Sequence, residues 1–120
     1  MLAYVAATLI AVWGIAHVVP TKRVVAGFAP ITADNRRILT QEWLAESLTM
    51  WGMAALVVAV TATEAGIQIT AIVYRVVAGL LVSLAVLTVF TGARTPIVWF
   101  KVCPALLATS AALLLVASIR

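Results

Sequence analysis

The sequence predicts an all-α integral membrane protein, folded as an antiparallel four-helix transmembrane bundle. Hydrophobic residues make up 65% of the chain and charged residues only 10%, whereas a soluble domain has about 45–50% apolar and about 25% charged residues. Four apolar runs, each long enough to cross a bilayer, occupy most of the chain. Turn residues separate the runs, so residues 1–120 are expected to form a single transmembrane domain.

The first span is expected at residues 2–19, and it ends at a proline that two basic residues soon follow. A secretory signal peptide would carry its basic residues before the apolar run. The run is therefore interpreted as a retained span of about 18 residues, which is short for a crossing. Trp13 and His17 are four residues apart, so they share one face of this helix.

Residues 20–37 are interpreted as an interfacial connection. Pro20 and Pro30 interrupt helical structure. Residues 24–29, however, are too apolar for an ordinary solvated loop, so this segment is expected to lie at the membrane interface. Asp34 is the predicted N-cap of the second long helix, because its carboxylate can accept hydrogen bonds from the first free backbone amides.

Three further spans are expected at residues 38–61, 68–91 and 97–119. A short turn ending at Gly66 separates the second span from the third, and Pro96 is placed to open the last helix. The second helix is longer than a span requires, so its first two turns are expected to project into the interface.

The basic residues determine the predicted orientation. One end of the spans receives six of the eight, namely Lys22, Arg23, Arg36, Arg37, Arg94 and Lys101. The other end receives Arg75 and Arg120. The positive-inside rule then predicts a multi-pass protein of the cell membrane with the first end in the cytoplasm and both termini outside.

Some of these cations have a second expected role at the membrane surface. Contact with lipid headgroups is predicted for Lys22, Arg23, Arg36 and Arg37. The cations form no stripe beside aromatic residues on a polar surface, so nucleic acid is not an expected partner.

The predicted topology brings polar residues that are distant in the sequence to the cytoplasmic end. The candidates for catalysis are His17, Glu42 and Glu46. The candidates for ligand binding are Trp13, Trp43, Arg94, Trp99 and Lys101. Ionisable residues in or just below a bilayer are costly, which makes them functional candidates. Tryptophans near helix ends are also typical of the aromatic belt at a membrane surface.

Glu42 and Glu46 lie one helical turn apart, and like charges at that spacing repel. The repulsion is relieved if one carboxyl is protonated or if a cation lies between them, such as Lys101, Arg94 or protonated His17. Either arrangement would give a group that handles protons or binds a ligand. In the structural alternative, Glu42 pairs with Lys101 to hold two helices together while Glu46 reaches water.

The sequence predicts no metal site and no cofactor. Cys103 is the only cysteine and is interpreted as a small buried apolar residue. His17, Glu42 and Glu46 have the chemistry to hold a divalent ion, but no compact ligand motif supports one.

Three short segments carry a resemblance to a known group. These segments are Gly14-Ile15-Ala16-His17, Asp34-Asn35-Arg36-Arg37 and Glu42-Trp43. Together with the layout of four short spans, they resemble the small DoxX-like membrane proteins. That group is associated with quinone-linked sulfur redox chemistry. This chain has no redox motif, so the resemblance implies the architecture and no catalytic residues.

The expected function is binding of a lipophilic small molecule or a lipid headgroup in a polar pocket at the cytoplasmic end, as an accessory subunit. One alternative is a membrane enzyme performing acid–base chemistry of isomerase or redox type on a lipophilic substrate, with Glu42 or Glu46 as base and His17 as acid. The other is a small dimeric transporter, because glycine and alanine on the helices would allow chains to pack closely. The expected partners are membrane lipids, a lipophilic molecule, and a second copy or another membrane protein.

Overall fold

The computed structural model describes residues 1–119, and these residues contain helices and no strand. The helices are α1 (Leu2–Val18), α2 (Thr21–Ala26), α3 (Ala33–Ala62), α4 (Ile67–Phe90) and α5 (Val98–Ala117), with a 3-10 turn, η1 (Gly92–Arg94), before α5. The prediction of an all-helical chain is confirmed. Arg120, to which the sequence assigns a role in orientation, lies outside the described residues.

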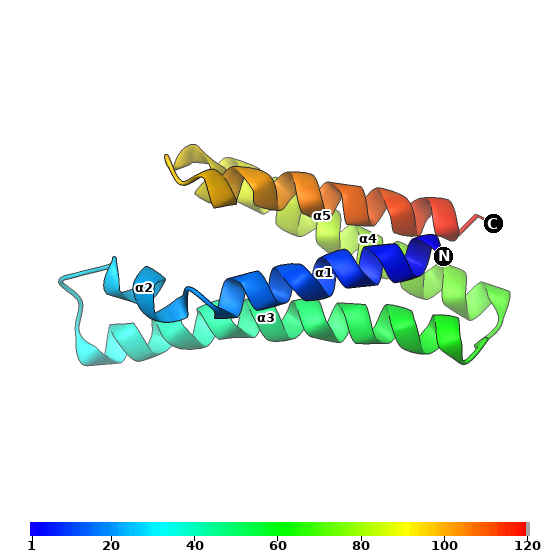
Figure 1. Cartoon of the computed structure of the whole chain (residues 1–120), viewed down its shortest axis with the longest axis horizontal. Coiled ribbons are helices and arrows are strands. Elements are labelled where there is room, and N and C mark those ends of the chain that lie inside the picture. The colour runs from blue at the N-terminus through cyan, green and yellow to red at the C-terminus, as the bar shows by residue number, and fades with distance from the viewer. Residues whose placement is uncertain (120) are drawn as a thin grey trace.

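The four main helices, α1, α3, α4 and α5, lie along the 51 Å long axis of the molecule (Figure 1). The chain reverses direction from each of these helices to the next, so the start of α1 and the end of α5 lie at the same end (Figure 1). Helix α1 packs against both α3 and α5, and α4 packs against α5. The interface between α3 and α4 is much less extensive than those of the α1–α3 and α4–α5 pairs.

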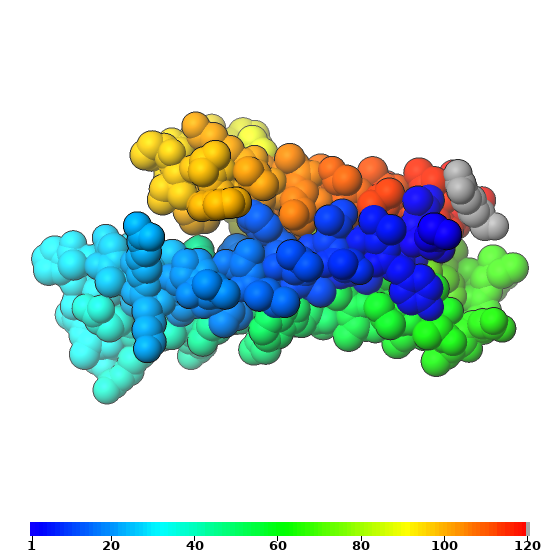
Figure 2. Space-filling view, in the orientation of Figure 1, coloured from blue at the N-terminus to red at the C-terminus, as the bar shows by residue number. Residues whose placement is uncertain are grey.

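Three segments are long and apolar enough to cross a membrane, namely Ala33–Ala62, Ile67–Arg94 and Val98–Ala117. The first expected span is also an apolar helix, but α1 has only 17 residues. At 1.5 Å per residue it is about 26 Å long, slightly less than the hydrocarbon core of about 30 Å. Helix α3 begins before the expected span at 38–61, and with α2 it extends past the α4–α5 turn (Figure 2).

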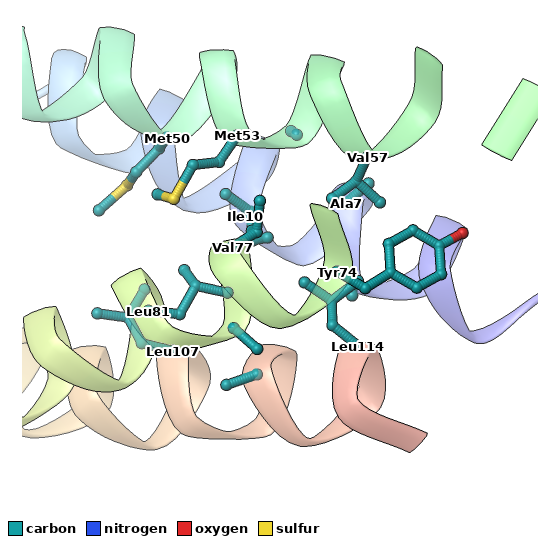
Figure 3. Close-up of a cluster of buried hydrophobic side chains, with 14 of the residues drawn as sticks. Ala7, Ile10, Met50, Met53, Val57, Tyr74, Val77, Leu81, Leu107 and Leu114 are labelled. Carbon is teal, nitrogen blue, oxygen red and sulfur yellow. The ribbon is translucent and has the colours of Figure 1, made fainter. Parts of the chain in front are cut away.

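All four main helices contribute to the packed interior (Figure 3). Its side chains include Ala7, Ile10, Met50, Met53, Val57, Tyr74, Val77, Leu81, Leu107 and Leu114. Large aliphatic side chains also cover the outside, and on α4 they form a stripe of Ile72, Val76, Leu80 and Leu87. A soluble monomer rarely exposes an apolar surface of this extent, so this stripe is suited to contact with lipid.

The N-cap of α3 differs from the sequence prediction. The hydroxyl of Thr32, not the carboxylate of Asp34, accepts a hydrogen bond from the backbone N–H of Asn35 at 3.2 Å. Asp34 lies in the first turn, where its carboxylate pairs with Arg37 at 3.1 Å. From this position the negative carboxylate interacts favourably with the positive end of the helix dipole. It also offsets the positive charge of Arg37, which is unfavourable near a helix N-terminus.

Helices α1 and α3 approach closely at Gly14. A Cβ atom added there would lie 2.5 Å from Nε1 of Trp51. The same indole N–H donates a hydrogen bond to the carbonyl oxygen of Ala11 at 3.1 Å. Because Gly14 has no side chain, the Trp51 ring can pack directly against the backbone of α1.

We expect Gly14→Ala to lower the free energy of unfolding in detergent by about 1–3 kcal/mol, the usual range for overpacking. The Trp51 ring would have to move and would lose its hydrogen bond to α1. Gly52→Ala is the matched control, because a Cβ atom there meets nothing within 4 Å. That control should be neutral or stabilising by about 0.5–1 kcal/mol. Thermal unfolding measures both variants, and equal stabilities would contradict the close contact.

Candidate functional site

A half-open groove of about 480 Å³ lies between α3 and α4. It is next to the C-terminal end of α1 and to the α4–α5 turn. Its polar lining consists of His17, Glu42, Glu46, Thr49, Thr88 and Thr91. Its apolar lining includes Leu84, Leu87, Phe100 and Cys103. At the rim, Ala45 and Thr49 of α3 and Leu87 and Thr91 of α4 are exposed, so the groove opens to the outside of the molecule between these two helices.

The groove contains a close pair formed by two of the sequence-predicted candidates. Nε2 of His17 lies 3.1 Å from a carboxylate oxygen of Glu46. The His17 side chain is only 8% exposed, whereas that of Glu46 is 35% exposed. The contact is an ion pair when the imidazole is protonated, and a neutral imidazole with its proton on Nε2 can still donate a hydrogen bond to the carboxylate.

Trp43 holds the imidazole in this orientation. Its ring stacks on the His17 ring with centroids 4.5 Å apart and an interplanar angle of 23°. Its indole N–H also donates a hydrogen bond of 2.6 Å to the backbone carbonyl of His17. That carbonyl belongs to the last turn of α1, where helical carbonyls lack intrahelical partners. One side chain therefore fixes both the ring of His17 and the end of its helix.

Further aromatic rings surround this contact. Phe100 of α5 meets Trp43 edge-on with ring centroids 6.3 Å apart, and Trp13 meets His17 edge-on at the same distance. The sequence offers Trp13 and Trp43 as ligand-binding candidates or as part of an aromatic belt, and neither contributes to the groove lining. In the structure, Trp13 is buried and Trp43 is half-buried against His17.

Glu42 faces the same groove but has no ion pair among the described residues. Neither Lys101 nor Arg94 lies between the glutamates. The Arg94 guanidinium lies 5.5 Å from the centre of the Phe90 ring, and Lys101 is exposed without an ion pair within residues 1–119. The helix-locking partner expected for Glu42 is therefore not observed, and His17 is the partner of Glu46 alone.

The remaining sequence-predicted residues lie outside the groove. Trp99 is 66% exposed on α5 and does not contribute to the lining. Lys22, Arg23, Arg36 and Arg37 are all exposed on α2 and the first turns of α3. Helix α2 and the start of α3 form the part of the molecule that extends past the α4–α5 turn (Figure 2).

Sequence reasoning did not identify the three threonines or Phe100 as part of the site. Thr88 and Thr91 are three residues apart at the end of α4, so a shared face could have been read from the sequence. Their position opposite Glu42 and Glu46 depends on the rotation of α4 about its axis, for which the sequence carries no comparable signal.

Two buried polar atoms near the pair lack hydrogen-bond partners among the described residues. They are Nε1 of Trp13, one turn before His17, and Oγ of Ser47, next to Glu46. The Trp13 indole lies beside Cys103, which lines the groove. Unpartnered polar atoms are uncommon in packed interiors, and these two lie close in the sequence to the members of the pair.

The described residues contain no group of three histidine, cysteine, aspartate or glutamate side chains able to hold a metal ion. Comparison of the chain with protein-family models, curated proteins and solved structures finds no match. The resemblance to DoxX-like proteins thus stays a prediction, and function has to be inferred from the geometry of the groove.

We expect the contact between the buried His17 and the partly exposed Glu46 to contribute to stability. A double-mutant cycle with His17→Phe, which keeps an aromatic ring against Trp43, and Glu46→Gln should give a coupling free energy of about 1–2 kcal/mol in unfolding measurements. The loss of a charge-assisted hydrogen bond at a mostly buried position is the physical reason.

The exposed pair of Asp34 and Arg37 is the control for this cycle. Its side chains are 83% and 81% exposed, so the cycle of Asp34→Asn and Arg37→Gln should give a coupling below about 0.5 kcal/mol. A coupling for His17 and Glu46 no larger than this control would show that the two residues are neighbours without a stabilising interaction.

Proposed function

We propose that this chain is a multi-pass protein of the cell membrane, an antiparallel four-helix transmembrane bundle that binds a lipophilic small molecule in the groove between α3 and α4. The three helices long enough to cross and the outward aliphatic stripe of α4 support the membrane location. The alternating directions of the four main helices support the bundle (Figure 1).

The observation that carries the binding function is the composition of the groove. Ionisable side chains and hydroxyl groups from α1, α3 and the end of α4 line the groove together with apolar side chains, and its volume of about 480 Å³ is within the usual range for ligand pockets, about 300–1,000 Å³. Glu42 lies about 20 residues before the end of α3, the length of one crossing, so the groove lies at the boundary of the hydrocarbon core. A molecule with one polar end and one apolar end fits this position.

The accessibility of the ionisable residues favours binding over acid–base catalysis. A general acid has to come within hydrogen-bond reach of the atom that it protonates. His17 is almost fully buried and its Nε2 is engaged by Glu46. Glu42 is instead the ionisable group that a ligand in the groove meets first, and one exposed carboxylate is better suited to holding a ligand than to paired proton transfer.

Native mass spectrometry of the protein extracted with its own lipids tests the binding function. We expect the wild type to retain a specific small molecule and the Glu42→Gln, Glu46→Gln double variant to lose it. Glu64→Gln is the matched control, because it removes an exposed carboxylate just beyond the opposite end of α3. Equal, nonspecific lipid in all three proteins would contradict a binding groove and would indicate a role through a protein partner.

The basic residues support one orientation of the bundle. The end that carries the groove also carries Lys22, Arg23, Arg36, Arg37, Arg94 and Lys101. Such a surplus favours the cytoplasmic side and contact with anionic headgroups. The start of α1 and the end of α5 would then face outward.

Cysteine labelling tests this orientation. In a Cys103→Ala background, Gln68→Cys at the start of α4 should react with a membrane-impermeant maleimide on intact cells. Asn35→Cys at the start of α3 should react only after permeabilisation, since the two positions lie at opposite ends of the bundle. The reverse pattern would invert the orientation, and equal labelling of both on intact cells would contradict a crossing of the membrane by α3.

A further inference from the structure

The threonine hydroxyl groups that line the groove all donate hydrogen bonds to backbone carbonyls. Each of the three threonines in the lining bonds to a carbonyl of its own helix: Thr49 to Ala45 at 2.8 Å, Thr88 to Leu84 at 2.8 Å and Thr91 to Leu87 at 2.7 Å. A hydroxyl has one proton and two lone pairs. These residues consequently present only hydrogen-bond acceptors to a bound molecule.

The ionisable residues of the groove also present acceptors. Glu46 has His17 as its partner, while Glu42 has no basic partner among the described residues. The nearby cations do not compensate this charge, because Arg94 lies over the Phe90 ring and Lys101 is not part of the lining. Two donors lie near these acceptors: the indole N–H of Trp13, which does not contribute to the lining, and the thiol of Cys103, a weak donor in the lining beside Trp13 and Thr88. The groove therefore has acceptors in excess and a negative charge.

We infer that the molecule bound in this groove is a lipophilic ammonium, that is, a protonated amine on a hydrocarbon body; this inference rests on the binding function proposed above. The ammonium group supplies a positive charge opposite Glu42 and N–H donors for Glu42 and the threonine oxygens. The hydrocarbon body lies against Leu84, Leu87 and Phe100. An amphiphile in the bilayer reaches the groove through the opening between α3 and α4.

Other classes of ligand match the lining less well. An anionic headgroup would lie against two carboxylates with only His17 to offset them. A neutral alcohol has a single donor and no charge. Its hydrocarbon chain would displace water near Glu42 without providing a counter-ion, which is unfavourable. A quaternary ammonium carries the charge but has no N–H to donate.

Four probes with the same eight-carbon chain separate these classes: octylammonium, octyltrimethylammonium, 1-octanol and octanoate. Each is titrated into the whole protein in a neutral maltoside detergent. The readout is the saturable change in tryptophan fluorescence, because Trp43 contacts both His17 and Phe100 of the lining. We expect octylammonium to bind most tightly, octyltrimethylammonium and octanol more weakly, and octanoate not to bind saturably.

Glu42→Gln is the decisive variant because it is nearly isosteric and Glu42 is exposed, so the fold should be unaffected. It should weaken octylammonium binding by at least about tenfold, the effect expected on loss of a charge-assisted hydrogen bond. Octanol binding should change by less than about threefold, since the alcohol carries no charge. Glu64→Gln should leave the affinity for all four probes unchanged.

The remaining outcomes overturn the inference in distinguishable ways. Equal binding of octylammonium and octanol, insensitive to Glu42→Gln, would leave a lipophilic binding groove but refute the ammonium. Preferential binding of octanoate would refute it by assigning an anionic ligand. If no probe binds saturably and native mass spectrometry finds no retained molecule, the inference and the proposed binding function both fail.

Discussion

The contact between His17 and Trp43 is the interaction on which the rest of the groove depends. Trp43 stacks on the imidazole and binds the backbone carbonyl of the same residue, so it positions the side chain and the end of α1 together. Glu46 follows Trp43 by three residues and lies on the same face of α3, which lets one helix hold His17 from two directions. Because α1 ends here, the imidazole becomes part of the groove lining instead of the packed interior.

The groove exists because the four helices pair unequally. Helix α1 packs against α3 and α5, and α4 packs against α5, while the interface of α3 with α4 is the least extensive of those between neighbouring main helices. Along most of the molecule, alanine and medium apolar side chains fill the space between the helices. At the end near the α4–α5 turn, α3 diverges from α4 and charged and hydroxyl side chains line the opening. Glu46 and the three threonines have hydrogen-bond partners within the protein, whereas Glu42 has no ion pair among the described residues, so Glu42 is the group that a ligand is proposed to engage.

Much of this arrangement follows from the sequence, and the rest depends on helix rotation and tilt. The apolar runs predict the helices, and the alternation of their directions predicts that His17, Glu42 and Glu46 share one end. The sequence could not select His17 over Lys101 and Arg94 as the partner of Glu46, because the choice depends on which way α1 and α5 face. The prediction of Asp34 as N-cap is wrong for a local reason: threonine is also a good N-cap residue, and the extended backbone conformation at Thr32 places the cap there. The sequence offers Trp43 as a ligand-binding candidate or a membrane-surface belt residue, because nothing local in the sequence signals a partner 26 residues away.

The two glutamates have different roles. Glu46 fits the structural interpretation, in which an acidic residue joins two helices, and Glu42 fits the interpretation as a ligand-binding residue. Glu46 is partly buried and engaged by His17, so its carboxylate joins α3 to α1. Glu42 is one turn nearer the start of α3, exposed in the groove and without an ion pair among the described residues. Like charges one turn apart repel, and His17 offsets the charge of Glu46 alone. The charge of Glu42 has no partner of this kind. A cation bound in the groove would offset it and would donate hydrogen bonds to the surrounding threonine oxygens. In the proposed binding mode, Glu42 is thus the residue that would give the groove its preference for a positively charged ligand.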